Sequence, residues 1–267
     1  MSAVTVTPID GWSPDQYERF RSERQQPFND LLMLCYPVPG GRIVDLGCGT
    51  GDLTKVLHEE MEAKETVGVD SSPTMLERAS SAYGDVPGLS FAQGDIATWL
   101  DEGLQLVFAN ASLHWVPHHA ALLARLRFSL APGGQLAFQV PATFDHPSHR
   151  LAREVAAEPA FAPDHDDGGP GPADNVLTPA RYAEILHGLG AIQQHARLQV
   201  YGHLLPSVES VVEWVRGSLL SPIRARMDEP TFEAYLDRYR ERLLGELGQR
   251  RPYFYAFSRI LCWARFA

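Results

Sequence analysis

The residues best suited to chemistry form a short glycine-rich run, Asp45-Leu46-Gly47-Cys48-Gly49-Thr50-Gly51. An apolar run precedes it and a helical pattern follows, which is the strand, turn and helix entry to a nucleotide-binding sheet. A dinucleotide fingerprint needs a third glycine where this chain has Asp52, and two carboxylates around one turn repel phosphate. The pattern favours a nucleoside that carries a cationic sulfonium and an ammonium group. It therefore predicts S-adenosylmethionine as the cofactor. The expected contacts in this run are Asp45, Gly47, Gly49 and Gly51.

Two more acidic residues follow the next predicted strands. Asp70 ends the second strand, where a carboxylate can accept two hydrogen bonds from a ribose diol, with Ser71 beside it. The competing interpretation is a helix cap, which the neighbouring serines can also provide. Asp95 and Ile96 follow the third strand and suit the amino group and the ring of adenine. An ordinary turn aspartate is the alternative there.

The fourth predicted strand ends in Asn110-Ala111-Ser112-Leu113-His114-Trp115-Val116-Pro117. We expect backbone carbonyls at Asn110 and Ala111 to hold the ammonium group of the cofactor. Trp115 either forms a wall of the cofactor site or packs in the core. His114 is a candidate general base, although a carboxylate nucleophile is already ionised at pH 7 and needs none.

The N-terminal segment from Trp12 to Leu34 is expected to be helical and broken at Pro27. Tyr17 and Arg24 lie two helical turns apart, so they can share one face. From that face Arg24 can pair with the carboxylate of the cofactor, and a solvated surface arginine is the alternative.

The elements that position these residues alternate between apolar strands and helices. Strands are predicted at about 42–46, 66–70, 89–92, 104–109 and 135–140. Helices are predicted between them at about 51–61, 74–82 and 118–130. Later come a helix at 181–189, a strand at 192–204, helices within 208–247 interrupted at Pro222 and Pro230, and a strand at 257–266. This alternation predicts a doubly wound α/β sheet, in which ligands lie beyond the carboxyl ends of the strands.

The composition of the chain argues against several classes of protein. The 267 residues carry 33 acidic and 23 basic side chains, a formal charge of −10, which argues against a nucleic-acid partner. No apolar run approaches the ~20 residues of a membrane helix, and no signal peptide is visible, so we expect a cytoplasmic protein. The three widely spaced cysteines predict buried thiols.

An acidic segment at 159–175 contains the run Asp164-His165-Asp166-Asp167. Its prolines and glycines predict an exposed loop. Flexible ligands without a supporting shell bind metal poorly, so we expect no metal site.

Several motifs outside the glycine turn share the pattern of one family. They are Trp12-Ser13-Pro14, Tyr17, Phe20, Arg24 and Pro27; Asp70 to Pro73 with Met75; Asn110 to Pro117; Leu130 to Gly133; Gln139-Val140-Pro141; Pro147-Ser148-His149; Tyr201 and His203; Glu213-Trp214-Val215; Leu220 and Pro222; Phe257 and Arg259. Over about 12–265 the chain resembles the trans-aconitate 2-methyltransferase family of class I methyltransferases.

The resemblance implies methyl transfer from S-adenosylmethionine to one carboxylate of trans-aconitate, which yields a monomethyl ester and S-adenosylhomocysteine. It also implies a Rossmann-like, seven-stranded, mostly parallel sheet whose last strand is antiparallel. Position 114 accepts His or Gln in relatives, which weighs against a base role. The implied substrate-side residues are Arg181, Tyr182, Tyr201, His203 and Arg259.

We expect one methyltransferase domain with a helical cap. The sheet core covers about 40–145, 178–204 and 253–267, and the cap about 12–34, 146–177 and 205–250. The chain departs from the family pattern near Tyr182, at Gln199 and Val200 and before Arg259, which are substrate-side positions. Methylation of another small acid, or of a carbon, nitrogen or hydroxyl acceptor, is therefore the alternative function. A non-catalytic cofactor-binding regulator is a further alternative, and a nicotinamide dehydrogenase is disfavoured by Asp52.

Overall fold

The computed structural model of the chain describes residues 21–162, 172–216 and 219–267. Two compact units are present. The sheet unit comprises Ser22–Ala142, Pro170–Tyr201 and Phe257–Ala267, and the helical unit includes Thr143–Gly169 and Gly202–Ala256. The predicted limits of a single domain with a cap stay a prediction.

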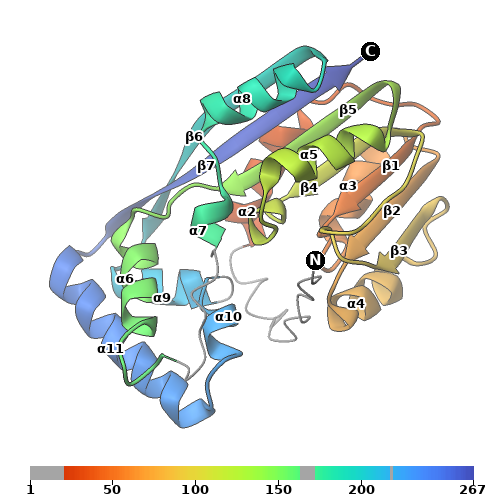
Figure 1. Cartoon of the computed structure of the whole chain (residues 1–267). Coiled ribbons are helices and arrows are strands. Elements are labelled where there is room, and N and C mark those ends of the chain that lie inside the picture. Colours follow the sequence, from red (N-terminus) through yellow and green to blue (C-terminus); the bar gives the residue numbers. More distant parts are fainter. Residues whose placement is uncertain (1–20, 163–171, 217–218) are drawn as a thin grey trace, which may run out of the picture. The chain divides into compact units, whose positions relative to one another are not determined.

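A seven-stranded sheet forms the centre of the sheet unit (Figure 1). Its strands are β1 (Arg42–Leu46), β2 (Glu65–Asp70), β3 (Leu89–Gln93), β4 (Leu104–Asn110), β5 (Leu130–Pro141), β6 (Ala191–Leu205) and β7 (Tyr253–Phe266). They lie in the order β3-β2-β1-β4-β5-β7-β6. The strands from β1 to β5 pair in parallel, and β7 pairs antiparallel to β5. The predicted mostly parallel sheet with an antiparallel last strand is confirmed.

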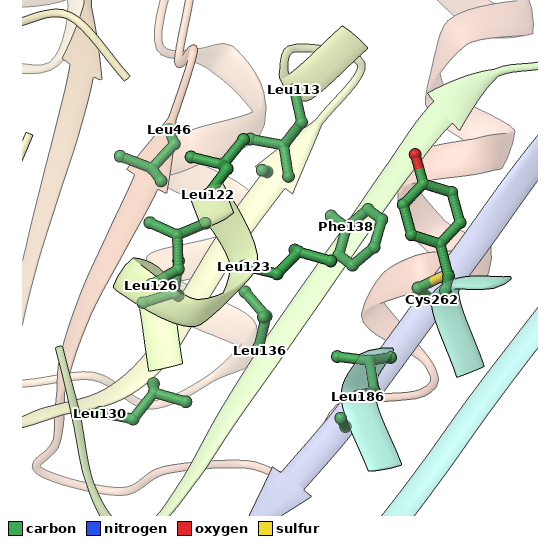
Figure 2. Packing of buried hydrophobic residues seen from close by; sticks show 14 of the residues in the cluster. Leu46, Leu113, Leu122, Leu123, Leu126, Leu130, Leu136, Phe138, Leu186 and Cys262 are labelled. Atoms are coloured by element: carbon green, nitrogen blue, oxygen red, sulfur yellow. The ribbon is translucent and has the colours of Figure 1, made fainter. Parts of the chain in front are cut away.

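One face of the sheet is covered by α5 (His119–Phe128) and α8 (Pro179–Gly188). Figure 2 shows leucines of α5 meeting Leu136 and Phe138 of β5, with Leu186 of α8 near Cys262 of β7. Successive side chains of a strand point to opposite faces of the sheet, so every second residue of β5, such as Leu136 and Phe138, faces α5 and α8. This cluster is the larger of the two that sandwich the sheet.

The opposite face is covered by α2 (Arg21–Leu32) and α3 (Asp52–Glu60). The prediction that Pro27 breaks the first helix is wrong, because α2 runs through it. A proline inside a helix costs about 3 kcal/mol. Burial of Phe28 and Leu31, each of which contributes roughly 1.5–3 kcal/mol, offsets that cost. The ring of Phe28 meets that of Phe108 edge-on at 5.5 Å.

The remaining helix of the nucleotide-binding half is α4 (Pro73–Tyr83), which packs along β3 and β2. Ser72 caps it and accepts a hydrogen bond from the Met75 amide, as the Ser-Pro signal predicts. The predicted turn at 132–134 is instead the irregular start of β5, with a register shift between Leu104 and Leu106 of β4.

Helices make up most of the described part of the helical unit. They are α6 (Pro147–Ala156), α9 (Glu209–Arg216), α10 (Ser221–Arg224) and α11 (Glu229–Leu247). The predicted interruptions at Pro222 and Pro230 are confirmed, because one helix ends before each proline and the next helix begins with that proline in its first turn. The α6 helix was not predicted, and it packs against α11. The described part of the sheet unit also contains the short helices η1 (Leu113–Trp115) and α7 (Pro172–Asn175).

Among the described residues, none of the helices combines the length and the apolar character needed to cross a membrane. The three cysteines are buried free thiols, as predicted.

Candidate active site

The glycine turn between β1 and α3 has a backbone that side chains would distort. Gly47, Gly49 and Gly51 all have φ between +56° and +82°, the left-handed region that glycine adopts without strain. A β-carbon on Gly47 would collide with the side chain of Ser112, and one on Gly51 would come within 2.7 Å of Phe91. Around Gly49 the same position is open, with no heavy atom within 4 Å among the described residues other than its two chain neighbours. The turn is therefore tightly packed at Gly47 and Gly51, whereas the β-carbon position of Gly49 is open among the described residues.

Asp70 ties the end of β2 to this turn. One carboxylate oxygen accepts the Gly49 amide at 2.9 Å, and the other accepts the Ser72 amide at 2.9 Å. The helix-capping role falls to Ser72. A carboxylate oxygen accepts more than one hydrogen bond, so Asp70 retains capacity for a diol while its orientation is fixed.

Asp45 is buried at the end of β1, and its carboxylate accepts a 2.6 Å hydrogen bond from the Thr54 hydroxyl. Burial raises the pKa of Asp45 to about 7; the Thr54 bond lowers it and the charge of Asp70 raises it further. A nearby cation would stabilise the ionised form of such a carboxylate. A positively charged ligand bound at the turn would therefore lower the pKa of Asp45.

Asp52 begins α3, and its carboxylate is also held in place. One oxygen accepts the Thr50 hydroxyl at 2.6 Å and the other the Tyr83 hydroxyl at 2.7 Å. These bonds connect the end of α4 with the glycine turn. They also fix a negative group in the helix turn where a diphosphate would need free amides.

Asp95 and Ile96 follow β3 at the predicted place. The Asp95 carboxylate accepts the Ala97 amide at 2.8 Å, and its side chain is otherwise exposed. This bond makes an Asx-type turn. Ile96 is half-buried, and its carbonyl accepts the Arg125 guanidinium at 2.6 Å. Both the turn role and a ligand role are compatible with this geometry.

The end of β4 lies beside the glycine turn. Asp45 of β1 lies opposite Phe108 of β4 in a parallel pair of strands. Gly47 and Asn110, each two residues further along, therefore lie level with each other. The Ser112 hydroxyl donates to the Leu46 carbonyl. Ala111 holds a left-handed φ of 56°. That conformation costs a residue with a β-carbon roughly 1–2 kcal/mol. The Ala111 amide is held by the Gln139 carbonyl at 3.0 Å.

His114 and Trp115 lie in η1, with ring centroids 4.7 Å apart. His114 is buried and its carbonyl accepts the Asn175 amide group at 3.0 Å, while Trp115 is half-buried. The roles of general base and of cofactor wall stay predictions for these two residues.

A polar row crosses three adjacent strands on the face that α2 covers. Arg259 of β7 donates to Gln139 of β5 at 2.9 Å, and Gln139 donates to Asn110 of β4 at 2.7 Å. Arg259 is only 9% exposed, and its guanidinium lies over the Phe257 ring at 5.0 Å. These hydrogen bonds connect the buried guanidinium cation of Arg259 to Asn110, which lies level with Gly47 of the glycine turn.

Comparison with known proteins finds a matching family model and similar proteins that share one name. A family model described as a methyltransferase domain matches residues 43–134. Trans-aconitate 2-methyltransferase of Deinococcus radiodurans is 43% identical over 94% of this chain and 96% of its own length. The proteins of that name from Streptomyces avermitilis and Acidovorax ebreus are each 38% identical, over 88% and 95% of this chain and 89% and 98% of theirs.

The chain belongs to the trans-aconitate 2-methyltransferase family.

Solved structures share the fold at lower identity. The YcgJ protein of Bacillus subtilis superposes with a TM-score of 0.61 at 12% identity, covering 91% of this chain and 98% of its own. Phosphoethanolamine N-methyltransferase 2 of Haemonchus contortus, in complex with S-adenosyl-L-methionine, gives a TM-score of 0.55 at 14% identity, over 100% of this chain and 62% of its own. These similarities show the class I methyltransferase fold.

The protein is therefore an S-adenosylmethionine-dependent methyltransferase, and the turn fits that cofactor. Asp70 offers oriented oxygens for the ribose, Asp45 favours a cationic partner, and the space above Gly49 admits a ligand against the backbone. The predicted cofactor residues that the structure describes are Asp45, Gly47, Gly49, Gly51, Asp70, Ser71, Asp95, Ile96, Asn110, Ala111 and Trp115, and their contacts with the cofactor stay predictions. Tyr17 and the side chain of Arg24 lie outside the described residues, as does the run 164–167.

The predicted substrate residues fall in different surroundings. The Tyr201 hydroxyl donates to Asp30 of α2 at 2.8 Å; burial and Asp30 raise the pKa of Tyr201, while the charges of Arg259 and Arg197 lower it, for a net rise. His203 belongs to the helical unit, where its ring lies 4.5 Å from that of Trp214.

Arg181 and Tyr182 of α8 are poorly suited to bind substrate. The Arg181 side chain is 58% exposed and pairs with Glu184 at 2.7 Å. Tyr182 is fully buried, and its hydroxyl meets His119 and accepts the Leu177 amide at 3.2 Å. Its ring packs edge-on against Phe138 in the core. These surroundings weigh against substrate contacts for both residues, whose substrate roles stay predictions.

Sequence reasoning assigned no site role to three residues that shape the site, although Gln139 belongs to one of the family motifs. Thr54 bonds Asp45, Gln139 links Asn110 to Arg259, and Asn175 holds the His114 carbonyl. Thr54 was detectable in principle, because it lies in the first turn of the predicted helix. The other two depend on strand register and loop packing, which no local pattern encodes.

Proposed function

We propose that this protein transfers the methyl group of S-adenosylmethionine to one carboxylate of trans-aconitate, giving a monomethyl ester. The observation that carries the proposal is the 43% identity, over nearly the full length of both chains, with the Deinococcus radiodurans protein of that name. The buried guanidinium of Arg259 supports it, because a fixed cation near the cofactor edge suits an anionic substrate.

The acid needs little activation. Its carboxylates are ionised at pH 7, since model carboxyl groups titrate near pH 4. When bound, S-adenosylmethionine supplies a methyl group attached to a positively charged sulfur. The carboxylate oxygen bonds to the methyl carbon as the carbon–sulfur bond breaks, so an anion and a cation become neutral groups. No proton is transferred, and His114 has no obligatory role.

The tasks of the protein are then binding, alignment and exclusion of water. Asp70 orients the ribose and Asp45 balances the positive charge at the turn. Arg259 and Tyr201 of the sheet unit are the proposed contacts for carboxylates of the substrate, and the substrate role of His203 stays a prediction. Holding a weak but charged nucleophile near the methyl carbon supplies rate through proximity.

Mass spectrometry of the products tests this proposal. Purified protein, S-adenosylmethionine and trans-aconitate should yield a product heavier than the acid by one methylene group, together with S-adenosylhomocysteine. A panel of other di- and tricarboxylic acids, amines and phenols should give much slower turnover. Faster methylation of another compound in the panel, or binding of the cofactor without turnover of any, would contradict the proposal.

A further inference from the structure

The donors and acceptors of the three side chains fix the direction of both hydrogen bonds in the Arg259–Gln139–Asn110 row. A guanidinium has donors and no acceptor, so the atom of Gln139 that it contacts must be the amide oxygen. The amide nitrogen of Gln139 is then the donor to Asn110, and it meets the Asn110 side-chain oxygen at 2.7 Å. Asn110 consequently turns its own NH₂ group away from Gln139. The charge at Arg259 thereby sets which group Asn110 presents at the edge of the glycine turn.

Burial makes this row rigid. Gln139 is 1% exposed and Arg259 is 9% exposed, and hydrogen bonds are stronger where water is excluded. Gln139 also acts through its backbone, because its carbonyl accepts the amide of Ala111 in the left-handed conformation. One residue therefore fixes the side chain of Asn110 and the backbone that follows it.

We propose that Gln139 is a positioning residue for methyl transfer, which holds Arg259 toward the anionic substrate and Asn110 toward the cofactor in one hydrogen-bonded unit. This inference rests on the proposed function for its substrate half. Its cofactor half concerns the orientation of Asn110 and can be measured without any acceptor. Gln139 does not itself touch the reacting atoms.

Gln135 provides a matched control from the same strand. It is buried, and it lies four residues before Gln139 on the same face. Four residues of strand span about 13 Å. The Gln135 amide bonds the backbone of Tyr36 and the indole of Trp263 at 2.8–2.9 Å. It shares the burial and the hydrogen bonding of Gln139 but has no link to Arg259 or Asn110.

Gln139→Glu separates positioning from packing. A carboxylate at 139 forms a charge-assisted bond with Arg259, so the melting temperature should stay unchanged or rise. The same carboxylate cancels the charge that attracts the substrate and forces Asn110 to donate, which turns the Asn110 oxygen toward the cofactor. We expect KM for trans-aconitate to rise at least about tenfold and Kd for S-adenosylhomocysteine to rise about three- to tenfold.

Gln139→Met removes both hydrogen bonds without adding charge. Its melting temperature should fall, and that of Gln135→Met should fall at least as much because three side-chain hydrogen bonds are lost there. KM for trans-aconitate should rise in Gln139→Met and stay at the wild-type value in Gln135→Met. A purely structural role would give the two methionine variants the same kinetic profile.

The readouts are steady-state kinetics with trans-aconitate, calorimetry with S-adenosylhomocysteine and thermal melting. Unchanged KM and unchanged Kd in folded Gln139→Glu would overturn the inference. If the wild-type protein does not methylate trans-aconitate, the proposed function fails. The calorimetry then decides the cofactor half, because an unchanged Kd in Gln139→Glu contradicts it and a raised Kd supports it.

Discussion

The glycine turn of the sheet unit and the tyrosine network of the helical unit are organised in opposite ways. In the turn, the geometry is set by the backbone: three glycines with positive φ and the amides that Asp70 collects. In the helical unit, the geometry is set by side chains around Ser148. Its hydroxyl meets the Tyr255 hydroxyl and His149 Nδ1, both at 3.0 Å, and its carbonyl accepts the Tyr239 hydroxyl at 2.9 Å.

These two kinds of organisation should respond differently to amino-acid substitution. A backbone-built site has no tolerance for a β-carbon at its tightest points, because the clash cannot be relieved by a rotamer change. A side-chain network loses one hydrogen bond at a time, and each is worth about 1 kcal/mol. The following four substitutions test this contrast.

Gly47→Ala should have the largest effect. Its β-carbon would collide with Ser112 in a left-handed backbone, so the turn must deform. We expect the affinity for S-adenosylhomocysteine to fall more than about 100-fold, measured by calorimetry, with a lowered melting temperature. Gly49→Ala should destabilise the free protein less, because space is open around that position. Wild-type affinity in Gly47→Ala would break the contrast between the two regions.

Asp70→Asn should come next. The neutral amide keeps an acceptor for one of the Gly49 and Ser72 amides but loses the charge and one of the two carboxylate oxygens. Hydrogen bonds to charged groups contribute about 1.5–3 kcal/mol, so cofactor affinity should fall about 10–100-fold. The control is Asp101→Asn, which removes a carboxylate that pairs with Arg42 at 3.2 Å and should leave affinity unchanged. An equal loss in both variants would point to a nonspecific charge effect.

Asp45→Asn should change how stability depends on pH. The unfolded carboxyl has a pKa of about 3.9. Burial raises the folded pKa to about 7, so between these values the folded state binds more protons. The free energy of unfolding of the wild type should therefore fall as pH rises from about 4 to about 7 and level off above. In Asp45→Asn this contribution, on the order of 4 kcal/mol for a shift of about three pKa units, should be absent.

Urea titrations without cofactor between pH 5 and 8 measure this slope. Thr54→Val, which removes the bond that lowers the pKa of Asp45, should extend the fall in stability to higher pH. Identical slopes in the wild type and Asp45→Asn would show that another group dominates.

Tyr239→Phe should have the smallest effect. It removes one buried hydrogen bond to the Ser148 carbonyl. Stability should therefore fall by about 1 kcal/mol, and cofactor affinity should not change. The matched control is Tyr36→Phe, at a tyrosine that is half-exposed. There the change in stability should stay under about 0.5 kcal/mol. A large loss of cofactor affinity in Tyr239→Phe would show that the two regions are energetically linked.

Local sequence patterns predicted the nucleotide-binding half well. Alternating apolar residues located the first four strands within a few residues, and Ser72-Pro73 fixed the start of α4. Patterns failed where burial outweighs propensity: α2 continues through Pro27 because Phe28 and Leu31 are buried against the sheet. Tyr182, to which the resemblance gives a substrate role, is fully buried, a burial that no local pattern indicated.

The glycines, the acids at the strand ends and the family motifs determined the fold class and the cofactor from sequence alone. These features are local, since a left-handed φ or a carboxylate after a strand has its meaning within a few residues. Only the tertiary structure joined Asn110, Gln139 and Arg259, which are up to 149 positions apart in the chain. Strand register decides such contacts, because a slip of one residue would turn each side chain to the other face of the sheet.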